Sequence, residues 1–219
     1  MNIYPALLSD SRLELQEQLD LIKDIEGISV VQVDVIDGKF ADNLTVTPAD
    51  LPDLDWGELQ IDIHLMTEEP LDYVYELRDV KEQLPIRAVI GQIERMTQQA
   101  HFLEDVQKNG WTPGISLDLF TPLEEIDEAT LRFIKIIQLM GIEAGFQGTE
   151  FNPLVLQKVA QLSKAAHELD MEIIVDGGVN LNNIGAIAKN GADSVAVGSL
   201  LWKSMDISET IAQLADGDR

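Results

Sequence analysis

Apolar and polar residues alternate along this chain with two different periods, which take turns from the N-terminus onward. Residues 30–36 place valine at every second position, with Gln32 and Asp34 between the valines, which is the two-residue period of a strand. Residues 153–169 instead carry apolar positions three and four apart, as an amphipathic helix does. The pattern therefore predicts strands and helices in alternation.

The same two periods predict elements along the whole chain. Strands are predicted at residues 2–8, 30–36, 59–66, 86–90, 113–119, 132–140, 172–175 and 193–197. Helices are predicted at residues 12–26, 71–80, 94–109, 153–169, 181–190 and 207–214, with short ones at 48–54 and 123–128. Eight such units without a linker favour parallel strands and crossover helices. The simplest closure is an α/β fold, a single (β/α)8 TIM barrel over residues 1–219; a doubly wound open sheet is the alternative.

The polar residues on the mixed strand faces are the candidate chemistry. In a barrel of this kind the aliphatic faces pack on the helices, the mixed faces point inward, and the site lies at the carboxyl ends of the strands. The residues expected at this mouth are Gln32, Asp34, Asp62, His64, Ser116, Asp118 and Asp176. A single buried aspartate is explained by hydrogen bonds in a structural role. Several buried carboxylates together require positive charge or protonation to compensate them. An Asp–His–Asp set from three strands predicts a divalent metal site for zinc, manganese or iron(II).

Glycine-bearing loops follow the last three predicted strands. They are Gly145-Phe146-Gln147-Gly148, Gly177-Gly178 and Gly198-Ser199. Glycine lets backbone N–H groups approach an anion closely, and phosphate binding near the last two strands is common in this fold. Each glycine alone is equally a turn or a helix end, but three such loops at one end of the barrel favour a phosphate site.

Composition narrows the partners. The 219 residues include 39 Asp and Glu against 15 Lys and Arg, a formal net charge of −24, which argues against nucleic acid and anionic membranes as partners. An anionic ligand must then be held by local backbone dipoles against this field. Cysteine is absent, so disulfides and thiol chemistry are excluded. No apolar run reaches the length of a membrane span and no signal peptide is visible, so a cytoplasmic location is expected.

These motifs together resemble the ribulose-phosphate 3-epimerase family through essentially the whole chain. The motifs that carry the resemblance are Pro5-Ala6-Leu7-Leu8-Ser9, Val33-Asp34-Val35-Ile36-Asp37-Gly38, Asp62-Ile63-His64-Leu65-Met66, Gly145-Phe146-Gln147-Gly148, Val175-Asp176-Gly177-Gly178-Val179 and Gly198-Ser199. The resemblance implies a phosphate-binding (β/α)8 barrel, a phosphorylated sugar as partner, and a homo-oligomer by analogy with family members.

The resemblance also implies a mechanism. In the family a divalent metal bound by two His and two Asp holds the ketose carbonyl and the adjacent hydroxyl, and two aspartates exchange the proton at C3. Carried over to this chain, Asp34 and Asp176 are the acid/base pair and metal ligands, and His64 is a ligand. Met66 would lie over the intermediate as an apolar wall.

The departures from the family pattern concern the reacting end of the site. The position of the first metal-binding histidine is Gln32, the serine usual in the first strand is Ala6, and the histidine usual at the end of the fourth strand is Gln92. A glutamine carbonyl can ligate a metal but binds zinc more weakly than imidazole, so we expect lower metal affinity or a harder metal.

Two functions stay open on the sequence. One is a metal-dependent epimerase of a ketose phosphate, an isomerase, which the retained Asp34, His64 and Asp176 favour. The other is a sugar-phosphate-binding barrel without turnover, which Ala6 and Gln32 favour. A Schiff-base aldolase would need a lysine at a strand end, and none is well placed.

Overall fold

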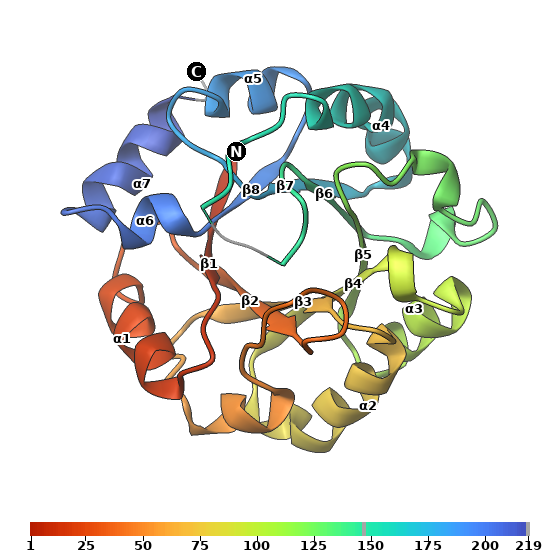
Figure 1. Ribbon diagram of the computed structural model, residues 1–219, viewed down its shortest axis with the longest axis horizontal. Helices are drawn as coiled ribbons and strands as arrows, with labels where there is room; N and C mark the ends of the chain where they lie inside the picture. The colour runs from red at the N-terminus through yellow and green to blue at the C-terminus, as the bar shows by residue number, and fades with distance from the viewer. Residues whose placement is uncertain (146–147, 218–219) are drawn as a thin grey trace.

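Eight parallel strands close into a barrel in the computed structural model, which describes residues 1–145 and 148–217 (Figure 1). The strands are β1 (Asn2–Leu7), β2 (Val30–Ile36), β3 (Gln60–Met66), β4 (Ile86–Gln92), β5 (Thr112–Leu117), β6 (Ile136–Met140), β7 (Glu172–Asp176) and β8 (Ser194–Val197). Each strand pairs with its neighbours in sequence, and β1 pairs with β8 to close the ring. The (β/α)8 prediction is confirmed.

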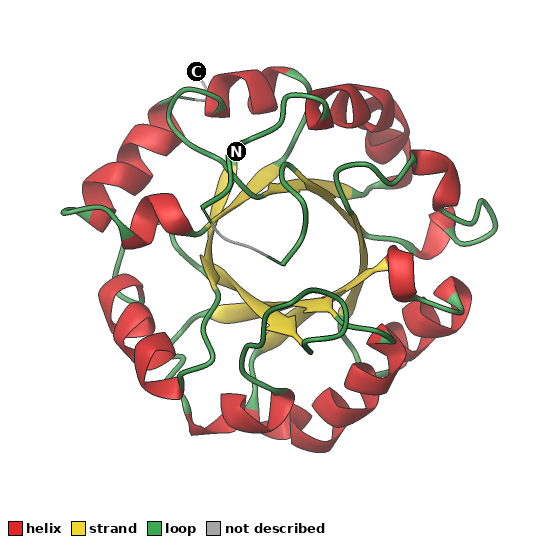
Figure 2. Cartoon of the chain, in the orientation of Figure 1, coloured by secondary structure: helices red, strands yellow, loops and turns green. Residues whose placement is uncertain are grey.

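Helices surround the barrel on its outer side (Figure 2). They are α1 (Arg12–Ile22), α2 (Pro70–Val80), α3 (Gln99–Lys108), α4 (Val155–Leu169), α5 (Ile184–Lys189), α6 (Ser199–Trp202) and α7 (Ile207–Asp216). Short 3-10 helices lie at Pro48–Asp53, Lys81–Gln83, Ile93–Arg95, Leu123–Glu125 and Leu131–Phe133. The crossovers from β2 to β3 and from β5 to β6 therefore run through 3-10 turns. In the β2–β3 crossover, Pro52 lacks the backbone N–H group that an α-helix would need at this position.

Several element ends differ from the sequence expectation. The helix expected at 12–26 ends at Ile22, and the strand expected from 132 starts at Ile136 because Leu131–Phe133 forms a 3-10 turn first. The helix expected at 181–190 begins only at Ile184, since the preceding residues form a turn closed by asparagine side chains. The short helix Ser199–Trp202 was not predicted.

The core lies in two layers, as strand alternation requires. Val31, Val33 and Val35 belong to the large cluster between the strands and the helices. A smaller apolar cluster fills the barrel interior, and it consists of Tyr4, Ala6, Val30, Ala88, Ile90, Ile136, Ile174 and Ala196. Polar side chains lie inside the barrel at both ends of this cluster, and the two polar sets have different structures.

The set at the amino ends of the strands is built around an ion pair. Asp62 is buried and accepts a hydrogen bond from Arg87 Nε at 2.7 Å and a second, shorter one from Arg87 Nη2. Arg87 also donates to Glu172, which accepts from the Tyr4 hydroxyl at 2.6 Å and from Ser194. The placement of Asp62 at the mouth is therefore wrong: it faces inward, but four residues before the end of β3, where Arg87 compensates its charge.

No helix of the described residues is long and apolar enough to cross a membrane.

Candidate active site

The carboxyl ends of three strands bring Asp34, His64 and Asp176 together inside the barrel mouth. The strands β2, β3 and β7 supply them, and all three side chains are buried. His64 Nδ1 lies 3.0 Å from Asp34 Oδ1 and 3.5 Å from Asp176 Oδ2. One potential ligand atom from each residue lies within 4.8 Å of the others. The structure thus joins two carboxylates and one imidazole that the alternation placed on inward faces.

Two glutamine amides complete this cluster. Gln32 Nε2 donates to Asp34 Oδ1 and to Asp176 Oδ2, both at 2.8 Å, so one amide bridges the two carboxylates. Gln138, on β6, donates to Asp176 Oδ2 at 2.9 Å. Both glutamines are fully buried. Sequence reasoning singled out Gln32 but missed Gln138, although its position on the same face as Met140, between Ile137 and Leu139, marks it as inward.

The far side of the His64 ring is held by Gln92 at the end of β4. With the amide turned so that its oxygen accepts from His64 Nε2 at 3.2 Å, its nitrogen donates to Glu94 and to the carbonyl of Ser116. This orientation places the ring proton on Nε2, so Nδ1 of a neutral His64 points its lone pair at the two carboxylates. Gln92 therefore orients the imidazole as the outer partner of a metal-binding histidine does.

Burial and mutual repulsion govern protonation in the cluster. Burial, and then the charge of Asp34, raise the pKa of Asp176 to about 7, while His64 and Gln32 oppose this. Burial disfavours the charged form of His64, but the hydrogen bond and charge of Asp34 and the charge of Asp176 raise its pKa above the usual value. Asp176 therefore holds a proton more readily than an exposed carboxyl does, and the amide donors of Gln32 and Gln138 stabilise the carboxylates.

The donor set fits a divalent cation. Two carboxylates, one correctly oriented imidazole nitrogen and glutamine carbonyls are ligand types that manganese, iron(II) and zinc accept. The oxygens Oε1 of Gln32 and Gln138 are buried and have no hydrogen-bond partner among the described residues. The cluster therefore holds acceptor atoms that its own donors leave unused.

Comparison with known proteins agrees with this geometry. Residues 2–202 match the family model described as the ribulose-phosphate 3 epimerase family. The chain belongs to the ribulose-phosphate 3-epimerase family. The ribulose-phosphate 3-epimerase of Helicobacter pylori is 30% identical over 209 residues, covering 94% of this chain and 93% of that protein. The enzyme of that name from Escherichia coli strain K12 is 31% identical over 223 residues, covering 97% and 93% respectively.

Solved structures of other proteins resemble this chain in fold alone. A thiamine phosphate pyrophosphorylase from Pyrococcus furiosus superposes with a TM-score of 0.61 at 15% identity, covering 99% of this chain and 94% of that one. A phosphoribosyl anthranilate isomerase from Thermus thermophilus gives 0.60 at 13% identity, covering 99% and 98%.

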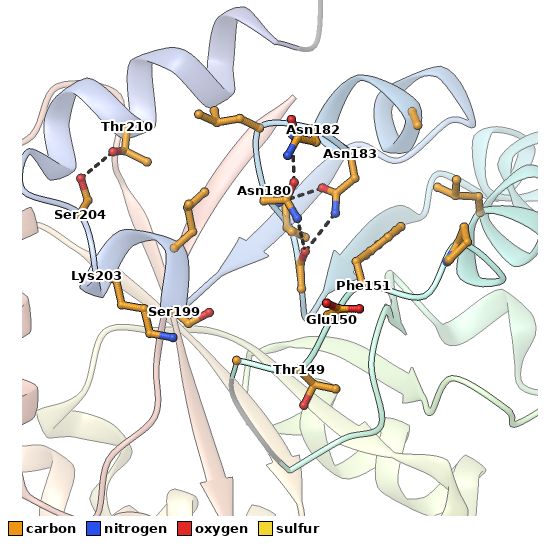
Figure 3. A pocket seen from close by; sticks show the side chains of 18 residues that line it. Thr149, Glu150, Phe151, Asn180, Asn182, Asn183, Ser199, Lys203, Ser204 and Thr210 are labelled. Carbon is orange, nitrogen blue, oxygen red and sulfur yellow. Dashed lines mark hydrogen bonds between the residues drawn. The ribbon is translucent and has the colours of Figure 1, made fainter.

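The glycine loops of this family member border two adjoining cavities. An inner cavity of about 40 Å³ is lined by Ala6, Leu8, Asp34, Met66, Met140, Ile142, Gly145, Gly148, Asp176, Gly177, Gly178, Val179, Gly198 and Ser199. An outer cavity of about 860 Å³ shares Gly148, Gly178, Val179 and Ser199 with it (Figure 3). Met66 thus borders the same space as the two aspartates. Phe146 and Gln147 lie outside the described residues.

Backbone conformation explains one of these glycines in particular. Gly178 has φ +69°, and a Cβ there would lie 2.7 Å from the backbone nitrogen of Phe151. Only glycine fits this position without displacing the chain that borders the outer cavity.

A lysine that sequence reasoning passed over also lines the outer cavity. Lys203 follows α6, and it makes no ion pair with any residue that the structure describes. Figure 3 draws it on the same side of the cavity as Ser199, facing Asn180 and Phe151. Its position in the sequence could have indicated this role. Lys203 lies five residues after Gly198, close enough for its side chain to reach the Gly198-Ser199 loop.

Asp118 is another correction to the predicted mouth. The strand β5 ends at Leu117, so Asp118 lies in the following loop, where its carboxylate accepts from the backbone N–H groups of Leu119 and Ala144. Ser116 is inward and buried, as expected. Asp118 therefore holds two loops together and is not part of the cluster around His64.

Proposed function

We propose that this protein is a metal-dependent epimerase that inverts the C3 carbon of a ketose phosphate, a ribulose phosphate being the first candidate. The single observation that carries the proposal is the buried Asp34–His64–Asp176 cluster beside a cavity lined by the glycine loops. The names of the relatives in the family support the substrate class.

In this proposal the two aspartates exchange the proton at C3 from opposite faces of the sugar. One carboxylate removes the proton and the other, protonated, returns one with inverted configuration. Burial and the charge of Asp34 raise the pKa of Asp176, and a cation bound to its carboxylate would oppose that shift. Asp34 and Asp176 come from β2 and β7, strands that are not neighbours in the ring, so their carboxylates approach the cavity from different sides.

The cation would be held by Asp34, His64 and Asp176, with Gln32 beside them. When bound, it supplies positive charge that stabilises the enediolate developing on the substrate. Gln92 keeps the His64 nitrogen directed at that position. Met66 and Met140 line the inner cavity beside the two aspartates and pack with Ile36, and this apolar wall would limit the access of water to the reacting carbon.

Proton exchange tests the function directly. The protein loaded with manganese, zinc, iron(II) or cobalt is incubated with D-ribulose 5-phosphate in deuterated water, and C3 is followed by NMR. We expect deuterium at C3 together with formation of the C3 epimer. Absence of exchange with all four metals would contradict this substrate. Saturable binding of the sugar phosphate without exchange would then favour the second candidate, a sugar-phosphate-binding barrel without turnover. Ala6 and Gln32 are the residues that favour this second candidate.

Replacement of Lys203 tests the phosphate end. Lys203→Gln is expected to raise KM for the sugar phosphate about threefold to fivefold with kcat unchanged, because an exposed ammonium contributes at most ~1 kcal/mol to an ion pair. Lys189→Gln, at the exposed end of α5, is the control with the same change in net charge. Equal KM values in the two variants would show that Lys203 does not contact the phosphate.

Three further expectations stay predictions. They are that residues 1–219 form one domain, that the protein is a homo-oligomer, and that it acts in the cytoplasm.

A further inference from the structure

Gln138 stands out because the proposed function leaves it without a role. It lies on β6, its side chain is fully buried, and its amide nitrogen is 2.9 Å from Asp176 Oδ2 and 3.1 Å from His64 Nδ1. The bridging amide of Gln32 lies 2.8 Å from the same Asp176 oxygen and 3.5 Å from the same His64 nitrogen. Two neutral amides thus approach the same two partners from β2 and β6.

The unused oxygens of these amides are the second observation. Oε1 of Gln32 and Oε1 of Gln138 are both buried without a hydrogen-bond partner among the described residues. The two ends of an amide are nearly equal in size, so a half-turn places each oxygen where its nitrogen lies. In the present orientation the oxygen of each amide has no partner, and a cation among the carboxylates favours the orientation with oxygen inward.

The spacing of the cluster matches a coordination sphere. Metal–oxygen bonds of about 2.0–2.1 Å in an octahedral site put neighbouring ligand atoms roughly 3 Å apart. The contacts of the two amide nitrogens with the three other side chains span 2.8 to 3.5 Å, and His64 Nδ1 lies 3.0 Å from Asp34 Oδ1. In these contacts the two amide groups, the carboxylate oxygens and His64 Nδ1 already stand at ligand-to-ligand distances.

We infer that Gln138 is a metal-site residue that acts together with Gln32, and that the two amide oxygens, Asp34, Asp176 and His64 form a five-donor, oxygen-rich site for a hard divalent cation. This inference rests on the proposed function for the presence of a metal. Four oxygens and one nitrogen favour manganese relative to zinc, compared with a set containing two imidazoles. In this structure the amide nitrogens of Gln32 and Gln138 face the carboxylates and donate to them.

Metal binding without substrate tests the inference. Binding of Mn²⁺ is measured by electron paramagnetic resonance and calorimetry, and coordination by the visible absorption of the Co²⁺ form. Gln138→Leu is expected to raise the Kd for Mn²⁺ about 10- to 100-fold and to strengthen the Co²⁺ bands as the coordination number falls. Gln138→Glu, which offers an anionic oxygen at the same place, is expected to bind Mn²⁺ more tightly than the native chain.

Gln18→Leu is the matched control. Gln18 is also buried with an unpartnered Oε1, but it lies on α1, away from the cluster. It should leave Mn²⁺ binding and the Co²⁺ spectrum unchanged. Unchanged Kd and spectrum in both Gln138 variants would overturn the inference. Since substrate is not involved, Gln138-dependent binding without proton exchange would leave the inference standing and contradict the proposed function.

Discussion

Asp176→Asn is expected to lower the rate of epimerisation strongly while leaving deuterium exchange at C3 in one of the two epimers. The amide cannot take or return a proton on its face of the sugar, whereas Asp34 still can on the other face. The loss of turnover should be about 10²- to 10⁴-fold, the usual contribution of a positioned acid or base. NMR of each C3 epimer separately in deuterated water, with saturating metal, measures both quantities.

The two-epimer design separates loss of the acid/base group from loss of the metal. Loss of the cation alone would remove exchange from both epimers equally, which would contradict the assignment of Asp176 as an acid/base. Asp170→Asn is the matched control, because it makes the same chemical change on a fully exposed side chain. It should leave exchange and epimerisation unchanged.

Arg87→Met is expected to destabilise the fold by about 3 kcal/mol or more, because it leaves Asp62 buried without its partner. Asp62→Asn/Arg87→Met removes the uncompensated charge as well and should recover much of the loss. Denaturant unfolding of the native chain and both variants, followed by circular dichroism, measures the difference. Equal stabilities of the single and double variants would show that Asp62 does not depend on Arg87.

The destabilisation should also depend on pH in a defined direction. Burial, and then the charge of Glu172, raise the pKa of Asp62, and Arg87 opposes that shift, so removing Arg87 leaves only causes that raise it. A carboxyl with a folded-state pKa above its unfolded value contributes stability at low pH that is lost as pH rises. The cost of Arg87→Met should therefore be smaller near pH 4 than at pH 7.

The alternation of residues was sufficient to predict the barrel and much of the site. Asp34, His64 and Asp176 each lie on a mixed strand face close to a carboxyl end, and parallel strands in a ring bring such positions together. The period of two cannot give depth along the barrel axis. Asp62 shares the face of His64 but lies two residues earlier, which is enough to move it from the mouth to the base.

Arg87 shows a second limit of sequence patterns. Strict alternation with Ala88 would point its side chain outward, but the pairing of β3 with β4 shifts register between Ile61 and Asp62, and the extra residue turns Arg87 inward. A bulge of this kind depends on packing in the neighbouring strand. The sequence expectation placed Asp62 at the mouth, and this bulge explains why its partner Arg87 was not visible in the pattern.

Gln138 was missed because a neutral side chain needs no compensating charge. Lys203 was missed because it stands alone and belongs to no motif. Their positions acquire meaning only when Asp176 and the outer cavity are seen beside them. Gln32 was recognised because it departs from the family pattern. The structure shows what this glutamine does: its amide bridges two carboxylates.

The polar set at the base of the barrel also bears on the rates of folding and unfolding. It joins the first strand to the last two, since the Tyr4 hydroxyl reaches Glu172 and Asn2 reaches Ser194. Contacts between such distant parts of a chain require closure of a long loop, and we expect them to form late in folding. Interactions absent from the transition state slow unfolding while leaving refolding nearly unaffected. We therefore expect the base of the barrel to govern how long the closed ring persists, and so to supply kinetic stability to the Asp34–His64–Asp176 cluster at the opposite end.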